Sequence, residues 1–372
     1  MRWLIVNTDY PDFLRQLYAA DETLARRSYA EQWQSRVDSL FGVADFYSTH
    51  LRELDHEAWD VIINAEPMQK QWAREQGLRC ARDTQWQLRW RRGFVPWPTR
   101  AVNRRWLYDI LEAQLKHYRP DVLYSMAIEA LGSDFVRVAK RYCRLVIGQH
   151  AAPLPTHDLG AYDLMLSSLP NLVDHFRAQG LRSEFVRLAF EPRVLQHLAP
   201  AEKQFDIAFV GGLGGPHDDG TRMLGQLARR HAVHVWGYGR DRLAPDSPLR
   251  ATCGPPLWGR AMYQTLRNAR IVFNRHIDVA ANYANNMRLY EATGVGTLLL
   301  TDRKDNLAQL FEPGRDVVAY GDLEECVALA AHYLAHDDER ERIAQAGQAR
   351  TLREHTWAHR MRELVEIASR YL

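Results

Sequence analysis

Short apolar, β-branched runs alternate with amphipathic stretches along the whole chain. The runs lack a strict polar–apolar alternation, as expected for parallel strands that helices cover on both faces. Between them, stretches such as 171–179 and 221–230 carry apolar residues at helical spacing. The pattern therefore predicts an α/β fold with two Rossmann-like, doubly wound domains. The predicted strands are 3–6, 61–64, 122–125, 145–148, 164–167, 185–188, 206–210, 233–236, 271–274, 297–301 and 316–320.

A proline-containing segment, FEPRVLQHLAPAEKQ at 190–204, is the best domain boundary. It divides the chain into a first domain (1–190), a linker (191–204) and a second domain (205–355), with a last helix in 356–372. That helix places its apolar residues on one face, and we expect it to cross back onto the first domain. Two such domains face each other across a cleft at the carboxyl ends of their sheets, where open α/β sheets bind ligands. The apolar residues of the last helix are Trp357, Met361, Leu364 and Ile367.

Composition narrows the functional classes. Of 372 residues, 46% are hydrophobic and 25% charged, which is typical of globular proteins and excludes extended disorder. With 48 basic and 46 acidic residues, the net charge of +2 does not favour a nucleic-acid binder. No apolar run approaches the roughly 20 residues of a membrane-spanning helix. The scattered residues Cys80, Cys143, Cys253 and Cys326 indicate reduced thiols, so we expect a cytoplasmic protein.

A glycine-rich turn follows the first predicted strand of the second domain, in FDIAFVGGLGGPHDDGTR at 205–222. Gly211, Gly212 and Gly214 would let the backbone approach a phosphate, and the helix after them offers free N–H groups. Arg222 could add a charge-assisted contact to a diphosphate. The spacing matches neither a dinucleotide-binding fingerprint nor a Walker loop. A phosphate contact is our prediction, and a plain glycine-rich turn is the alternative.

A short predicted helix after residue 286 carries Arg288 and Glu291 three positions apart, on one face. A carboxylate accepts hydrogen bonds from ribose hydroxyls, and a guanidinium can hold a phosphate. The alternative is an ion pair on a solvated helix surface, worth only tenths of a kcal/mol. His276 follows the strand at 271–274, which makes it a candidate phosphate contact.

The block NNMRLYEATGVGTLLLTD and the later blocks LFEPGRDVVAY, ERIAQAG and HTWAHRM resemble the nucleotide-sugar half of group 1 glycosyltransferases. The resemblance covers 205–362 and is closest to the spore-maturation CgeB-like branch. It implies a GT-B architecture that binds a nucleotide diphosphate sugar as co-substrate, with no essential metal and no other cofactor. Tyr283 stands where many retaining relatives have a glutamate, so the resemblance does not imply a stereochemical outcome.

By position, the resemblance assigns roles to residues of the second domain. Glu291 would bind the ribose and Arg288 the diphosphate region. The turn at 211–215 would pass near the donor phosphates, while the backbone from Gly254 to Trp258 would meet the base. The acceptor would enter from the first domain.

Polar side chains at strand ends of the first domain are candidates on the acceptor side. His150 follows the strand at 145–148, and its imidazole could take a proton from an acceptor hydroxyl. Asp9, Glu66 and Glu129 also follow predicted strands. Each of these carboxylates could equally be a cap or a turn residue.

An arginine- and tryptophan-rich segment spans 79–106, with eight arginines, four tryptophans and one acidic residue. Trp86 and Trp90 have the spacing of one helix face. This composition suits sugar stacking, phosphate contact or docking on anionic lipid headgroups, with Arg91 and Arg92 on the acceptor side. The alternative is an insertion whose tryptophans pack on the first domain while its arginines stay solvated.

These observations predict a metal-independent glycosyltransferase that moves a sugar from a nucleotide diphosphate donor to a hydroxyl of a glycan, protein or small molecule. The reaction needs a bound leaving group, positive charge to stabilise it and an aligned nucleophile. Two alternatives stay open. One is a GT-B-fold sugar-nucleotide epimerase or phosphorylase, and the other is a non-catalytic nucleotide-sugar-binding protein of surface-polymer assembly.

Overall fold

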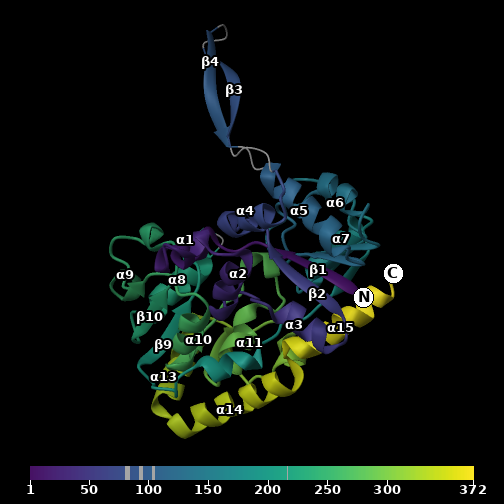
Figure 1. The fold of residues 1–372 in the computed structure, drawn as a ribbon. Helices are drawn as coiled ribbons and strands as arrows, with labels where there is room; N and C mark the ends of the chain where they lie inside the picture. The colour runs from purple at the N-terminus through teal and green to yellow at the C-terminus, as the bar shows by residue number, and fades with distance from the viewer. Residues whose placement is uncertain (80–83, 92–94, 103–104, 216) are drawn as a thin grey trace.

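The protein consists of two α/β domains, each built on a six-stranded parallel sheet (Figure 1). The computed structural model describes residues 1–79, 84–91, 95–102, 105–215 and 217–372, with side chains described outside 84–91 and 95–102. Helices flank both sheets, so the strands are buried on both faces and carry continuous apolar runs. The predicted fold of two doubly wound domains is confirmed.

The sheet of the first domain has the strand order β2-β1-β5-β6-β7-β8, with every neighbouring pair parallel. The predicted strand at 61–64 is β2, which begins earlier, at Glu57. Because β2 is an edge strand, polar residues fit its outer part, and the apolar run alone marked only its end. The elements are β1 (Arg2–Asn7), α1 (Pro11–Ala20), η1 (Leu24–Arg26), α2 (Tyr29–Asp38), α3 (Phe46–Glu53), β2 (Glu57–Ile62), α4 (Glu66–Glu75), α5 (Arg105–Tyr118), β5 (Val122–Ser125), α6 (Ser133–Ala139), β6 (Leu145–Gln149), β7 (Leu164–Ser167), α7 (Pro170–Ala178) and β8 (Ser183–Phe185).

The second sheet has the order β11-β10-β9-β12-β13-β14, again all parallel. The short 3-10 helix η2 (Pro192–His197) lies in the connection between the two sheets. The elements are β9 (Phe205–Val210), α8 (Asp218–Leu227), β10 (Val233–Trp236), η3 (Arg240–Arg242), α9 (Leu249–Thr252), β11 (Cys253–Gly254), α10 (Gly259–Arg267), β12 (Ala269–Phe273), η4 (Asp278–Ala280), α11 (Met287–Gly294), β13 (Leu298–Asp302), α12 (Leu307–Leu310), β14 (Val318–Tyr320), α13 (Leu323–Ala335), α14 (Asp337–Glu354) and α15 (Trp357–Ser369).

The last helix, α15, returns to the first domain and packs beside α3 (Figure 1). The ring centroid of Trp357 lies 4.8 Å from that of Tyr47 on α3. Farther along, Tyr371 donates a hydrogen bond to Glu184 of β8 at 2.9 Å. The predicted crossing is confirmed, and its apolar face is buried as expected: Trp357, Met361, Leu364 and Ile367 are each at most 7% exposed.

Hydrogen bonds join the two domains on both sides of the cleft. On one side, the Asn285 amide nitrogen donates to the carbonyls of Ser168 (2.9 Å) and Val186 (3.3 Å). On the other side, Arg260 donates from its backbone nitrogen to the Ser39 carbonyl at 2.9 Å. These contacts join the two domains directly at two separate places.

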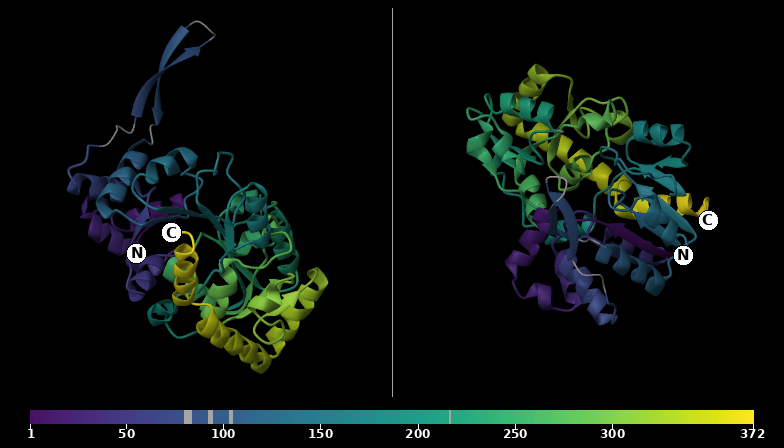
Figure 2. Two further views of the ribbon diagram at one scale, coloured as in Figure 1. Left: turned by 90° about the vertical axis from the view of Figure 1, so that its right-hand side faces the viewer. Right: turned by 90° about the horizontal axis from the view of Figure 1, so that it is seen from above.

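The arginine- and tryptophan-rich segment forms a two-stranded antiparallel hairpin, β3 (Thr84–Arg91) and β4 (Val95–Val102). Figures 1 and 2 show that it stands away from the first domain, so its backbone does not lie on the domain surface. Trp86 and Trp90 are therefore on a strand instead of a helix.

The cysteines fit the prediction of reduced thiols. Cys143, Cys253 and Cys326 are free and buried, while Cys80 lies outside the described residues. Among the residues that the structure describes, no helix combines the length and the apolar character needed to cross a membrane.

Candidate active site

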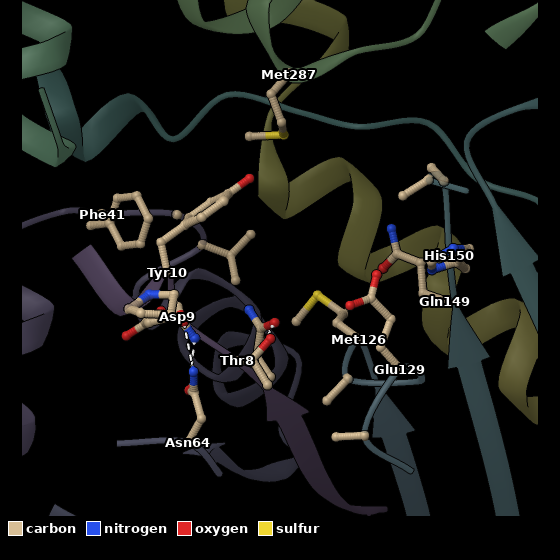
Figure 3. A pocket seen from close by; sticks show the side chains of 18 of the residues that line it. Thr8, Asp9, Tyr10, Phe41, Asn64, Met126, Glu129, Gln149, His150 and Met287 are labelled. Atoms are coloured by element: carbon tan, nitrogen blue, oxygen red, sulfur yellow. Dashed lines mark hydrogen bonds between the residues drawn. The ribbon is translucent and has the colours of Figure 1, made fainter. Parts of the chain in front are cut away.

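A cavity of about 1550 Å³ lies between the carboxyl ends of the two sheets, and residues of both domains line it (Figure 3). The first domain contributes the loops after β1, β5 and β6, and the second contributes the loops after β9 and β10 and the start of α11. This is the expected place for a ligand in facing open α/β sheets. Of the sequence-predicted site residues, the cavity brings together Asp9, Glu129, His150, Gly211, Gly212, Trp258, Arg288 and Glu291.

Arg288 and Glu291 form an ion pair in the cavity wall, with 2.8 Å between the Arg288 Nη1 and Glu291 Oε2 atoms. Their side chains are only 15% and 9% exposed, so the pair does not lie on a solvated helix surface. Burial raises the pKa of Glu291, and the charge of Arg288 opposes the rise. Arg288 also donates from Nη2 to the Val210 carbonyl at 2.8 Å. The pair thus joins α11 to the end of β9.

The amino end of α11 is fixed by side chains from neighbouring strand ends. Asn286 is the N-cap and accepts a hydrogen bond from the Leu289 N–H at 3.2 Å. Its amide nitrogen donates to Asn274 at 3.0 Å, and Asn274 in turn donates to Thr301 at 2.9 Å. The first helical residues, Met287 and Arg288, therefore line the cavity with a fixed orientation. A helix start of this kind attracts anionic groups.

The glycine-rich turn contributes two of its predicted residues to the cavity, Gly211 and Gly212. A Cβ atom at Gly212 would lie 2.7 Å from the Tyr238 ring, so only glycine fits there without displacement. Gly214 does not line the cavity and donates its N–H to Thr221 at 2.9 Å. Arg222 is exposed on α8, where it pairs with Asp219, away from the cavity.

Aromatic rings from both domains meet at one end of the cavity. Trp258 stacks on Tyr10 with ring centroids 5.4 Å apart and meets Phe41 edge-on at 5.0 Å. Trp258 lines the cavity, whereas Gly254 lies in β11 against Trp236. The rings offer faces on which a planar base can stack. Tyr10 was not predicted as a site residue, and its position directly after a strand end was the available signal.

The end of β6 and the loop after β5 bring His150, Gln149 and Glu129 to the floor of the cavity (Figure 3). The His150 Nε2 atom lies 3.0 Å from the Pro153 carbonyl oxygen. Since a carbonyl only accepts, we assign the ring proton to Nε2, which leaves a lone pair on Nδ1. The Glu129 side chain is exposed in the cavity.

Three other predicted residues, Asp9, Glu66 and His276, have structural partners. Asp9 accepts hydrogen bonds at 2.8 Å on both carboxylate oxygens from the buried guanidinium of Arg36. Glu66 begins α4 outside the cavity and pairs with Lys70 at 2.7 Å.

His276 is also outside the cavity. Its Nδ1 atom lies 2.7 Å from Asp302, and its Nε2 accepts from the Asn285 N–H at 3.3 Å. With both ring nitrogens engaged, its imidazole has no free atom for a phosphate.

The remaining predicted site residues are on the hairpin, and the last prediction concerns a metal. Arg92 lies outside the described residues, as does the side chain of Arg91. Within the part of the chain that the structure describes, no cluster of three or more His, Cys, Asp or Glu side chains could hold a metal ion.

The second domain is similar to a known family, and the whole chain is similar to solved structures. Residues 220–366 match the family model described as "Glycosyl transferase-like". No curated protein matches the chain. HepE (Alr3699) of Anabaena in complex with UDP-glucose is 12% identical, with 99% of each chain covered and a TM-score of 0.57.

Two further structures show the same likeness. A glycosyltransferase from Rickettsia africae ESF-5 is 8% identical over 100% of this chain and 98% of that one, with a TM-score of 0.59. AviGT4, a glycosyltransferase involved in avilamycin A biosynthesis, is 15% identical over 98% and 96%, with a TM-score of 0.55. At such identities the matches show a shared fold, the two-domain GT-B architecture.

Proposed function

We propose that this GT-B-fold chain, with its glycosyl transferase-like segment at 220–366, transfers a sugar from a nucleotide diphosphate sugar to an acceptor hydroxyl. The observation that carries the proposal is the buried Arg288–Glu291 pair at the start of α11, which contacts the end of β9 directly before the glycine turn and lines a cavity shared by both domains. The crystal structure of HepE in complex with UDP-glucose is consistent with a donor of this class. Closer membership of the CgeB-like branch remains a proposal from the sequence blocks.

In this proposal the second domain holds the donor. Glu291 accepts hydrogen bonds from the ribose hydroxyls, while Arg288 and the first N–H groups of α11 face the diphosphate. Gly211 and Gly212 let the backbone come close to the phosphates, and Trp258 offers a stacking face to the base. Positive charge at the leaving group stabilises the diphosphate as the bond to the sugar breaks.

The first domain supplies the acceptor side. The Nδ1 lone pair of His150 can take the proton of the attacking hydroxyl. Asp9, which we had placed on this side, instead keeps its carboxylate on Arg36 and supports the loop after β1.

A thermal-shift screen with UDP, GDP, UDP-glucose, UDP-N-acetylglucosamine and GDP-mannose tests the proposal. A ligand that binds only the native state raises the melting temperature by mass action. We expect at least one nucleoside diphosphate and its sugar derivative to stabilise the protein. No stabilisation across a widened nucleotide panel would refute donor binding. Analysis of the reaction products separates the alternatives. An epimerised donor would favour the epimerase, and formation of sugar 1-phosphate would favour the phosphorylase. Donor binding without turnover on a broad acceptor panel would favour the non-catalytic alternative.

Replacing the ribose acceptor should weaken the donor site. In Glu291→Gln, an amide offers one acceptor where the carboxylate offered two. We expect a loss of about 1–3 kcal/mol in donor affinity, measured by isothermal titration calorimetry, the scale of hydrogen bonds to charged groups. Glu312→Gln, an exposed position outside the cavity, serves as the control. An unchanged dissociation constant in Glu291→Gln would reject the ribose assignment.

Turnover should not depend on a divalent cation. Arg288 and the amino end of α11 provide positive charge where a metal would otherwise neutralise the diphosphate. We therefore expect the rate in excess EDTA to equal the rate without chelator. Complete loss of activity that manganese or magnesium restores would contradict this expectation.

We also propose that the β3–β4 hairpin contacts an anionic acceptor or the membrane that carries it. Eight arginines and one acidic residue in 79–106 make the segment strongly cationic. Arg91→Ala with Arg92→Ala should raise the acceptor KM, leave the donor KM unchanged, and weaken the salt dependence of acceptor binding. Acceptor kinetics equal to the parent would reject the acceptor contact. If the parent binds phosphatidylglycerol vesicles and the double variant does not, the hairpin contacts the membrane.

A further inference from the structure

Gln149, the last residue of β6, has an amide whose orientation is fixed by two tyrosines. Its Oε1 atom accepts a hydrogen bond from the Tyr47 hydroxyl at 3.1 Å and another from the Tyr124 hydroxyl. Gln149 lines the cavity between the positions of Glu129 and His150 (Figure 3). It was not among the predicted site residues, because glutamine has no titratable group to attract attention.

Both tyrosines keep their protons at any physiological pH. Tyr47 and Tyr124 are 2% and 1% exposed, and burial raises the pKa of each hydroxyl above its ordinary value. Two phenol protons therefore converge on one amide oxygen. Turning the amide over would leave at least one of those protons without an acceptor, at a cost of about 1–3 kcal/mol. The oxygen thus faces the tyrosines and the NH₂ group faces the cavity.

The C-terminal helix contributes to this arrangement although it lies outside the cavity. Trp357 at the start of α15 packs against Tyr47, with the ring centroids 4.8 Å apart. The ring centroids of Tyr47 and Tyr124 are 5.4 Å apart. The crossing of α15 therefore keeps the tyrosine pair, and through it the Gln149 amide, in one place.

Glu129 complements the amide. It follows β5, the strand that pairs with β6, so its carboxylate enters the cavity beside Gln149 (Figure 3). Within the described residues Glu129 forms no ion pair, and its side chain is exposed. A hydroxyl group matches a donor beside an acceptor, since its oxygen accepts from the amide and its proton goes to the carboxylate. A phosphate or carboxylate there would meet the negative charge of Glu129.

We propose that Gln149, held by Tyr47 and Tyr124, forms with Glu129 a subsite that selects a neutral sugar hydroxyl. This inference rests on the proposed function. The hydroxyl belongs either to the transferred sugar or to the acceptor, and the two sources are separated by experiment.

The test compares the parent with Gln149→Glu, which keeps the shape of the side chain and replaces the donor group with an acceptor. We expect kcat/KM to fall about 10- to 100-fold, the effect of losing a hydrogen bond to a charged or polar partner. UDP or GDP, whichever binds the parent, should bind the variant with unchanged affinity. If the variant binds the nucleotide sugar more weakly but the nucleoside diphosphate as well as the parent does, the hydroxyl belongs to the transferred sugar. If only the KM of the acceptor rises, the hydroxyl belongs to the acceptor.

Failure of this inference and failure of the proposed function give different results. Parent-like kcat/KM and affinities in Gln149→Glu would overturn the subsite while donor binding stands. Absence of nucleoside diphosphate binding in the parent would overturn the proposed function itself.

The positioning role has its own variant, Tyr47→Phe with Tyr124→Phe, which keeps both rings and removes both hydroxyls. Freed to rotate, the amide should lose discrimination, so the preference of the enzyme for a substrate over the analogue lacking the recognised hydroxyl should fall about 10-fold. Tyr162→Phe, which removes a buried hydroxyl outside the cavity, is the control for stability. Unchanged discrimination in the double variant would overturn the positioning role.

Discussion

His150→Ala should lower turnover about 10²- to 10⁴-fold, the usual contribution of a general base. The imidazole lines the cavity and donates its Nε2–H to the Pro153 carbonyl oxygen. Only Nδ1 is therefore able to take a proton from the hydroxyl of the acceptor substrate. Since the donor is proposed to sit on the second domain, its dissociation constant should remain near the parent value. Steady-state kinetics and calorimetric titration with the donor together measure this split.

His175→Ala is the matched control, because His175 is an exposed histidine on α7 outside the cavity. Its turnover should equal that of the parent. Equal activity in His150→Ala and the parent would return His150 to a structural role. A fall in donor affinity as large as the fall in turnover would also reject it as the base.

Asp60→Asn should stabilise the protein at neutral and alkaline pH, by as much as about 4 kcal/mol. Burial raises the pKa of Asp60 to about 7, although a hydrogen bond with Ser48 and the charge of Arg36 oppose the rise. One carboxylate oxygen, Oδ2, is buried without a hydrogen-bond partner. Deprotonation therefore places a poorly solvated charge on the edge strand β2.

The pH dependence follows from the raised pKa. The folded state holds the Asp60 proton more tightly than the unfolded state, so its stabilising effect is complete below about pH 4. It is lost progressively as pH rises to about 7, and the loss then stays constant. The asparagine variant has no such loss, so the stability difference should grow across this interval.

Urea unfolding of the parent and Asp60→Asn at intervals from pH 4 to pH 8 measures that difference. Asp174→Asn, an exposed position on α7, should show no comparable trend. A difference between Asp60→Asn and the parent that is independent of pH would contradict the assignment of the charge to Asp60.

The amino-acid sequence determined the elements and the class of fold. Apolar runs marked strands such as β5 and β7 because a strand covered on both faces must bury every side chain. The apolar face of α15 and the helix that carries Arg288 and Glu291 were also predictable, since helical spacing places residues on a common face regardless of what covers it. The conserved geometry of strand ends in open sheets indicated where a site would lie.

Tertiary structure decided which strand-end residues are available for chemistry. Asp9, His150 and His276 all follow predicted strands, yet Asp9 is bound by Arg36 and His276 by Asp302. Among the described residues, the His150 ring has a hydrogen-bond partner only at Nε2. The partners of Asp9 and His276 come from distant parts of the chain, and no local pattern identifies them. Whether a polar side chain is a ligand or a structural contact depends on which partner folding brings to it.

The same reason explains the two largest surprises. Nothing in the local sequence marks Asp60 as buried, and only the packing of the tertiary structure, including α3 against β2, makes its charge costly. Gln149 became a fixed hydrogen-bond donor because α3, β5 and α15 bring two hydroxyls and an indole to it. The periodicity of apolar residues predicts which face of a helix or strand is buried, because many residues along the element contribute to that pattern. Hydrogen bonding and charge depend on individual atoms a few ångströms apart, and only the folded chain sets those distances.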